Sequence, residues 1–352
     1  MKPGTTISNV RLAGIASAVP PLRTISWEEF GVSPDRFARA REHRRTPAIR
    51  AAAWEQCQSD YCQRAAETLL GRLGWEAAEI DVIIFVTLTP DYPIPATAII
   101  LQDRLGISKK ALAFDLPGGE VTFLQGLQLL ASMLSSGHLR RGLLLCGGVS
   151  KTVENPASIE SVEQICGHNG SVCALEYLSG AEPMHFNSGG DGAAHQAFYM
   201  PIGGTRRPPE PKMFQQQGPA AADNPAMRFA LDLEAVEAAA QRELPNCMRT
   251  VSDLSGRGPA EMDYCFLQPI SLATDDAIRQ QLGISRDRFH SMISEYGPCS
   301  SGGIVLAMLA RAATSLAGDS RTSLLAAAGA GLAWASAVVT TQNLVCPEPI
   351  EM

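Results

Sequence analysis

Two stretches of the chain repeat one pattern of apolar and polar positions. The first is AAEIDVIIFVTLTP at 77–90, followed by LQDRLGIS at 101–108. The second is PAEMDYCFLQPIS at 259–271, followed by IRQQLGIS at 278–285. Each copy predicts a buried strand and then a helix, because a short apolar run without alternation is typical of a strand covered on both faces. We therefore expect a fold built by duplication, with function where its halves meet.

Each copy continues with a second strand, a glycine-rich turn and a long apolar helix. In the first copy the strand is LAFDL at 112–116 and the loop is PGGEVTF at 117–123. In the second the strand is FHSMI at 289–293 and the loop is YGPCSSGG at 296–303. The duplication predicts that these two loops face each other.

The rest of the chain alternates in the same way between strand and helix patterns. Strands are predicted at 10–20, 142–150 and 171–178, helices at 54–74, 121–137 and 227–244, and a strand, glycine-rich turn and strand at 324–342. Such βαβ alternation predicts an α/β fold of mixed, mostly parallel sheets with helices on both faces. The halves are expected at 1–178 and 179–352. A segment rich in Gly, Pro, Gln and Ala, about 189–224, reads as an excursion or lid.

Composition narrows the class of protein. The 352 residues are 45% apolar and 18% charged, as in a globular protein with a large core. The net charge of −7 leaves no electrostatic footprint for nucleic acid. No apolar run approaches the length of a membrane span, and the first twenty residues lack the pattern of a signal peptide. We expect a cytoplasmic protein without membrane contact.

The spacing of the nine cysteines and six histidines indicates neither a disulfide framework nor a metal site. The cysteine number is odd and no C-x-x-C pair occurs, which argues against a disulfide framework and against zinc. The histidines lack partners at the spacing of metal ligands. Most cysteines are expected to be small buried hydrophobic residues.

The turn before the first long apolar helix places Glu120 at a helix N-terminus. Unpaired N–H groups and the positive end of the dipole favour a negative charge there. The flanking residues Gly118, Gly119 and Phe123 indicate a tight, poorly solvated setting. Glu120 is therefore a candidate pocket residue; the alternative is an ordinary acid in a first helical turn.

Five segments together resemble β-ketoacyl-acyl carrier protein synthase III and its relatives in the thiolase superfamily. They are RRTPAIR at 44–50, TPDYPIPATAIILQDRLG at 89–106, AFDLPGGEVTF at 113–123, HNGSVCAL at 168–175 and LLAAAGAGLAWASAVV at 324–339. The resemblance covers nearly the whole chain. It implies a thiolase-like fold of duplicated halves in five αβαβα layers, commonly dimeric. It also implies acyl-CoA or an acyl carrier protein as thioester donor, with no permanently bound cofactor.

The catalytic set of the family is replaced in this chain. Glu120 stands where the family has its nucleophilic cysteine. Gln268 stands where it has the histidine of P-H-Q-A-N, and Ser271, a candidate substrate contact, stands at the asparagine of that segment. Pro298 stands where it has the asparagine of H-G-N-T-S. Ala330 replaces a glycine that lends an oxyanion-hole N–H, and an alanine retains that N–H.

Three hypotheses about function follow. In the first, the chain is a condensing-type acyltransferase with altered chemistry, in which Glu120 acts as acid or base, Gln268 donates a hydrogen bond and the Ala330 N–H binds an oxyanion. In the second, it is a degenerate subunit that pairs with an active homologue. In the third, it binds acyl-CoA or an acyl carrier without turnover. Homodimer and heterodimer both stay open, and the pathway is of secondary-metabolite or fatty-acyl type.

Three further residues are candidates. Cys299, on the second loop, is a conceivable displaced nucleophile, although a packed thiol is the commoner fate. Arg45, in the basic run 39–45, matches an arginine of the family that contacts coenzyme A or a phosphopantetheine arm; a solvated helix face is the alternative. Phe37 is the nearest aromatic residue to the family's adenine-stacking tryptophan, which has no clear counterpart.

Overall fold

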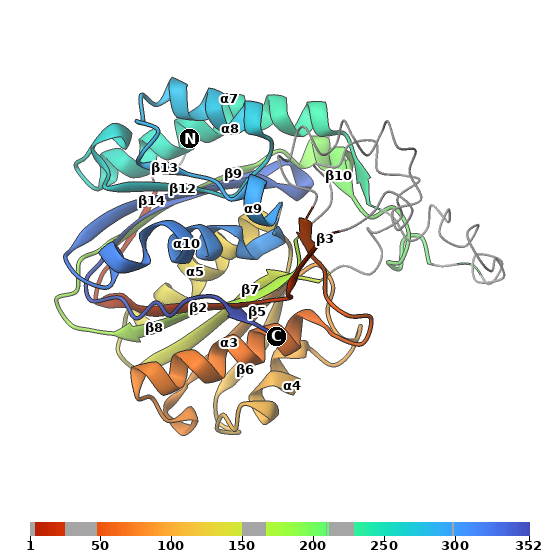
Figure 1. The fold of residues 1–352 in the computed structure, drawn as a ribbon, viewed down its shortest axis with the longest axis vertical. Coiled ribbons are helices and arrows are strands. Elements are labelled where there is room, and N and C mark those ends of the chain that lie inside the picture. Colours follow the sequence, from red (N-terminus) through yellow and green to blue (C-terminus); the bar gives the residue numbers. More distant parts are fainter. Residues whose placement is uncertain (1–3, 25–47, 150–166, 209, 211–228, 298) are drawn as a thin grey trace.

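Two six-stranded sheets enclose a pair of helices in the middle of the molecule (Figure 1). The computed structural model describes residues 4–24, 48–149, 167–208, 210, 229–297 and 299–352. The helices are α3 (Gln58–Leu73), α4 (Thr97–Arg104), α5 (Glu120–Leu134), α7 (Leu233–Leu254), α8 (Leu272–Gln281), α9 (Ile293–Tyr296) and α10 (Gly303–Leu316). α5 and α10 lie between the sheets, α3 and α4 cover one outer face, and α7 and α8 cover the other. This is the five-layered thiolase-like fold that the sequence predicts.

The two sheets have corresponding strand orders. The first runs β16 (Ile350–Glu351), β2 (Val10–Val19), β8 (Asn169–Tyr177), β7 (Arg141–Gly148), β5 (Val82–Thr87), β6 (Leu112–Pro117). The second runs β1 (Thr5–Ile7), β9 (Met184–Gly190), β15 (Ala333–Thr341), β14 (Arg321–Gly329), β12 (Tyr264–Leu267), β13 (Phe289–His290). The predicted duplication is confirmed, because β5–α4–β6–α5 and β12–α8–β13–α10 occupy equivalent places. Each terminal strand crosses to the sheet of the other half.

The sheets are mixed. β5 pairs in parallel with β6 and β7, and β12 pairs in parallel with β13 and β14. Towards the other edge the pairs β7–β8, β8–β2, β14–β15, β15–β9 and β9–β1 are antiparallel, and the edge strand β16 is again parallel to β2. The crossover helices of each repeat thus account for the parallel part, and the strands that close each half add an antiparallel part larger than the sequence indicates.

Local hydrogen bonds set where the helices of the first half begin. α3 starts four residues later than the pattern predicts, where the backbone N–H of Cys57 donates to Asp60 Oδ2 at 2.7 Å, and it ends at Gly74 in the left-handed region. α4 starts where the carboxylate of Asp115 on β6 accepts from the N–H groups of Thr97 and Ala98, at 2.7 and 2.8 Å. The strand that leads to the Glu120 loop is thereby tied to its crossover helix.

Helix α7 continues ten residues beyond its predicted end at Leu244. The sequence pattern stops there because Pro245 has no N–H and interrupts the helical ladder. In the structure the side-chain amide of Gln281 donates to the carbonyl of Gln241, at 3.4 Å, which is the carbonyl that Pro245 leaves without its helical partner. Packing against α8 therefore supplies the hydrogen-bond donor that Pro245 lacks.

The segment predicted as an excursion contains short elements. A 3₁₀ turn spans Gly192–Ala197, and β10 (Phe198–Tyr199) pairs with β11 (Ala230–Leu231). β3 (Leu22–Thr24) pairs likewise with β4 (Ala48–Arg50). Residues 209 and 211–224 of the predicted lid lie outside the described chain. Among the described helices, none combines the length and the hydrophobicity that crossing a membrane would require.

Candidate active site

Glu120 is the first residue of α5, and its carboxylate lies against the turn that joins β14 to β15. A Cβ atom added to Gly329 would lie 2.5 Å from Glu120 Oε2 and 3.1 Å from Cδ. The backbone N–H groups of the next residue, Ala330, and of Glu120 itself act electrostatically on the same carboxyl group. The structure therefore brings together Glu120 and Ala330, which lie far apart in the sequence.

The carboxylate of Glu120 is in a poorly solvated place. Burial raises the pKa of Glu120 above its ordinary value, and the backbone N–H groups of Glu120 and Ala330 oppose this by stabilising the charged form. Oε2 is buried and makes no well-aligned hydrogen bond in the described part of the chain. Both backbone N–H groups thus favour the charged form of a carboxyl that burial disfavours.

A test of this environment is the pH dependence of stability. Because the pKa of Glu120 is raised on folding, its carboxyl destabilises the fold progressively as pH rises from its ordinary pKa through its raised one. We expect Glu120→Gln to match the wild type in acid and to exceed it in melting temperature at neutral and alkaline pH. Glu234→Gln is the matched control, since Glu234 is an exposed first-turn acid of α7. A constant difference across pH would contradict the assignment.

Gln268 follows β12 and is almost completely buried. Its side chain is 1% exposed, and neither Oε1 nor Nε2 has a hydrogen-bond partner among the described residues. The amide packs on the start of α10, where an added Cβ at Gly303 would lie 2.5 Å from Oε1. Gln268 and Glu120 are not hydrogen-bonded to each other. An amide cannot serve as a general base, so Gln268 can offer a hydrogen bond only.

The second predicted loop forms the turn from Cys299 to Gly303. The thiol of Cys299 is 1% exposed and donates towards the carbonyls of Tyr296 and Gly297, each at 3.3 Å. Its neighbours Val19 and Leu306 are apolar. This is the environment of a packed thiol, and it favours that alternative for Cys299 over a displaced nucleophile.

Three polar residues at this turn escape the sequence analysis. Ser301 Oγ donates to the carbonyl of Gly147, at 2.9 Å, and accepts from the N–H of that residue, at 2.8 Å. Ser300 lies against the Glu120 loop, because an added Cβ at Gly119 would be 3.8 Å from its Oγ. Asn169 is fully buried beside the turn, and its Oδ1 lacks a partner in the described chain. The two predicted loops therefore meet, as the duplication suggests.

Of the other predicted site residues, the structure describes Ser271. Ser271 is the N-cap of α8, where its Oγ accepts from the N–H of Thr274 at 3.2 Å, and it is 3% exposed. Arg45, Phe37 and Pro298 lie outside the described residues. Whether Ser271, Arg45 or Phe37 contacts a substrate stays a prediction.

No group of metal-ligating side chains occurs in the part of the chain that the structure describes. The eight described cysteines form no disulfide. What the site can offer chemically is one carboxyl with a raised pKa, a buried amide and backbone N–H groups.

Comparisons with known proteins agree with this geometry. Residues 253–341 match the family model of the 3-oxoacyl-[acyl-carrier-protein] synthase III C-terminal domain. The chain is 31% identical to β-ketoacyl-[acyl-carrier-protein] synthase III 3 of Streptomyces coelicolor over 289 residues, which cover 80% of this chain and 82% of that protein. It is 26% identical to the enzyme of Symbiobacterium thermophilum over 330 residues, covering 93% and 97%.

Solved structures show the same relationship. A 3-oxoacyl-(acyl-carrier protein) synthase from Burkholderia xenovorans LB400 superposes with a TM-score of 0.89 at 26% identity, over 99% of both chains. OleA from Xanthomonas campestris, in a variant with glutamine in place of a glutamate, shares the fold with a TM-score of 0.76 at 16% identity, over 96% of this chain and 98% of that one. With the duplicated fold and its meeting loops, these matches place the chain in the β-ketoacyl-[acyl-carrier-protein] synthase III family of condensing enzymes.

Proposed function

We propose that this chain is a ketosynthase III-like subunit that forms no acyl-enzyme and pairs with a second, catalytically complete ketosynthase III homologue. The observation that carries the proposal is the position of the Glu120 carboxylate against the turn at Gly329 and Ala330, where the backbone N–H of Ala330 acts on it. In acyl transfer such N–H groups receive the oxygen of a tetrahedral intermediate. A side chain that fills this place leaves nowhere for a substrate oxygen to be stabilised.

The other members of the site support the same conclusion. Gln268 has no basic atom. Unlike a histidine, it can neither accept a proton from a nucleophile nor become a cation that stabilises a thiolate. Cys299 is buried against Val19 and Leu306, and its thiol lies at hydrogen-bond distance from two backbone carbonyls. Neither Gln268 nor Cys299 thus offers the base or the accessible thiol that formation of an acyl-enzyme requires.

A partner chain is favoured by the outer edge of the first sheet. β6 is the last strand there, and apolar side chains are exposed along it and along the segment that precedes it. They are Tyr92 (59% exposed), Ile94 (85%), Ile99 (45%) and Leu112 (48%). An open strand edge flanked by apolar side chains is a pairing surface. The acyl thioester substrate, as acyl-CoA or acyl carrier protein, would then be processed in the pocket of the partner.

The test is co-expression with each ketosynthase III homologue of the same organism. We expect a stable one-to-one complex by native mass spectrometry, with condensing activity that requires both chains, and no acyl adduct on this chain by intact-protein mass spectrometry after incubation with acyl-CoA. An adduct that survives Glu120→Gln and is lost in Cys299→Ala would overturn the proposal. Thioester turnover by the isolated chain would do so as well.

A second candidate is acid–base chemistry by Glu120 itself, and the raised pKa of this carboxyl is the observation that favours it. A carboxyl whose pKa is raised by burial holds its proton to higher pH than an ordinary one, which suits a group that donates and accepts a proton. Turnover of a thioester by the isolated chain that is abolished in Glu120→Ala would establish this function in place of the first.

A further inference from the structure

Asp275, in the first half of α8, is a buried carboxyl outside the contacts described so far. It is 4% exposed. Its Oδ1 accepts from the backbone N–H of Ile270 at 3.2 Å, and Ser291 Oγ donates to its Oδ2 at 2.5 Å. The N–H of Asp275 donates to the carbonyl of Ser271 at 2.9 Å. One side chain therefore joins α8 to two separate loops.

Both loops lead into the candidate site. Ile270 and Ser271 belong to the loop 268–271, which starts at the buried amide of Gln268. Ser291 follows β13 and precedes α9, from which the chain enters the turn beginning at Cys299. The position of Gln268 relative to that turn thus depends on what Asp275 holds together.

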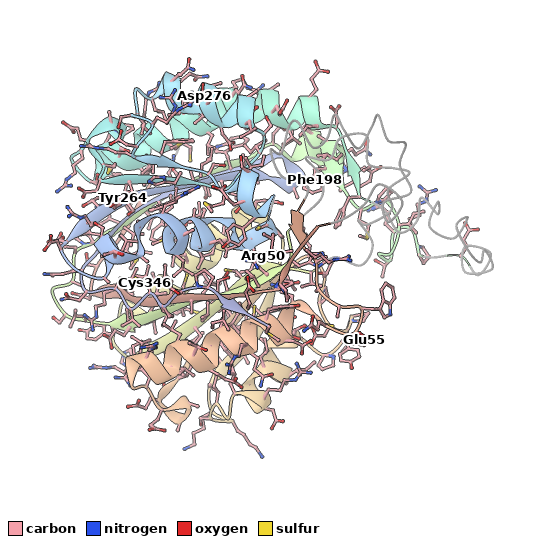
Figure 2. All side chains as sticks on the ribbon, in the orientation of Figure 1. Arg50, Glu55, Phe198, Tyr264, Asp276 and Cys346 are labelled. Atoms are coloured by element: carbon pink, nitrogen blue, oxygen red, sulfur yellow. The ribbon has the colours of Figure 1, made fainter. Side chains whose placement is uncertain are left out.

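The surroundings of Asp275 disfavour its charge. Its pKa is raised to about 7, mainly by burial and in smaller part by Glu237 on α7, while hydrogen bonds involving Ser291, Ile270 and Ser271 act in the opposite direction. The thiol of Cys265 on β12, which interacts electrostatically with Asp275, is buried as well. No ion pair joins Asp275 to a cation among the described residues, whereas its half-buried neighbour Asp276 is paired with Arg279 and Arg286. Figure 2 shows Asp276 at the outer surface of the molecule.

We propose that Asp275, in its protonated form, is a positioning residue that clasps the loop 268–271 to the corner at Ser291. A carboxylic acid can satisfy both contacts without a buried charge. Its carbonyl oxygen accepts from the N–H of Ile270, and its hydroxyl forms a hydrogen bond with the hydroxyl of Ser291. Ionisation places an unpaired charge beside Glu237, and solvating that charge requires the clasp to open. The loop that carries Gln268 is then released as pH rises.

The experiment is hydrogen–deuterium exchange of the full chain, analysed as protection factors for peptides that cover 264–275 and 286–297. From about pH 6 to about pH 8.5, protection of both peptides in the wild type should fall roughly tenfold, because the carboxyl ionises over this range. Asp275→Asn should keep its protection at both pH values, since an amide fits both contacts and cannot ionise. Asp276→Asn, one residue away and outside the clasp, should show the same fall in protection between the two pH values as the wild type.

Ser291→Ala provides an independent variant. It removes one side of the clasp, so both peptides should lose protection already at the lower pH, by about tenfold. Protection in the wild type that does not change with pH would overturn the proposal. So would a loss of protection in Asp275→Asn at both pH values, which would show that the ionised carboxylate is the form that holds the loops, or unchanged protection in Ser291→Ala.

Discussion

Glu120→Cys is expected to turn a chain that forms no acyl adduct into one that is acylated by acyl-CoA. The substitution removes the carboxylate from the N–H groups of Glu120 and Ala330 and puts a thiol at the N-terminus of α5. A thiol at a helix N-terminus has a lowered pKa, and the vacated N–H groups can stabilise the tetrahedral intermediate. Adding Gln268→His should accelerate acylation by a further factor of about 10²–10⁴, the usual contribution of a general base.

The measurement is intact-protein mass spectrometry over time with a series of straight-chain acyl-CoAs. Glu120→Ala is the matched control, because it clears the same N–H groups without supplying a nucleophile, and any adduct that it forms belongs to another cysteine. The double variant requires room for an imidazole, which the packing of Gln268 on Gly303 restricts. Equal adduct yields in Glu120→Cys and Glu120→Ala would show that the pocket is closed for reasons other than the carboxylate.

Much of the fold follows from the sequence because the signal is periodic and repeated. The two copies of strand, helix, LGIS, strand and glycine-rich loop predict equivalent positions in two sheets, and the structure has them as β5–α4–β6–α5 and β12–α8–β13–α10. The sequence also predicts that the two loops meet. It does so because a duplicated fold relates its halves by symmetry, which needs no knowledge of single contacts.

Other features depend on contacts between residues far apart in the chain. The sequence places Glu120 at a helix N-terminus but cannot tell that its carboxylate turns to Ala330, 210 positions later. Pro245 ends the helical pattern in the sequence. In the structure α7 continues, and a side chain from α8 donates a hydrogen bond to the carbonyl that the proline leaves without its helical partner. Asp275 looks like an ordinary polar residue of an amphipathic helix, because its burial is a result of packing between α8 and the corner at Ser291.

Ala113→Pro is expected to weaken assembly with a ketosynthase III-like partner by at least about 100-fold, equivalent to roughly 2.7 kcal/mol. The N–H of Leu112 donates to Asp81 and that of Gly118 to Thr87, so the even-numbered N–H groups of β6 face β5. Because strand residues alternate, the N–H of Ala113 points away from the sheet. A proline there removes an outward donor and leaves the pairing with β5 intact, which is where sheets tolerate proline.

Edge pairing predicts a specific contrast between two substitutions at this position. Ala113→Ser keeps the N–H and should assemble as the wild type, whereas Ala113→Pro should sediment as a species of 37.5 kDa at concentrations where the complex is otherwise intact. Sedimentation velocity of the co-expressed complex gives the dissociation constant, and circular dichroism and thermal unfolding establish that the proline variant is folded. A folded Ala113→Pro chain that assembles with unchanged affinity would place the interface elsewhere. The exposed Ile94 and Tyr92 would then need another partner.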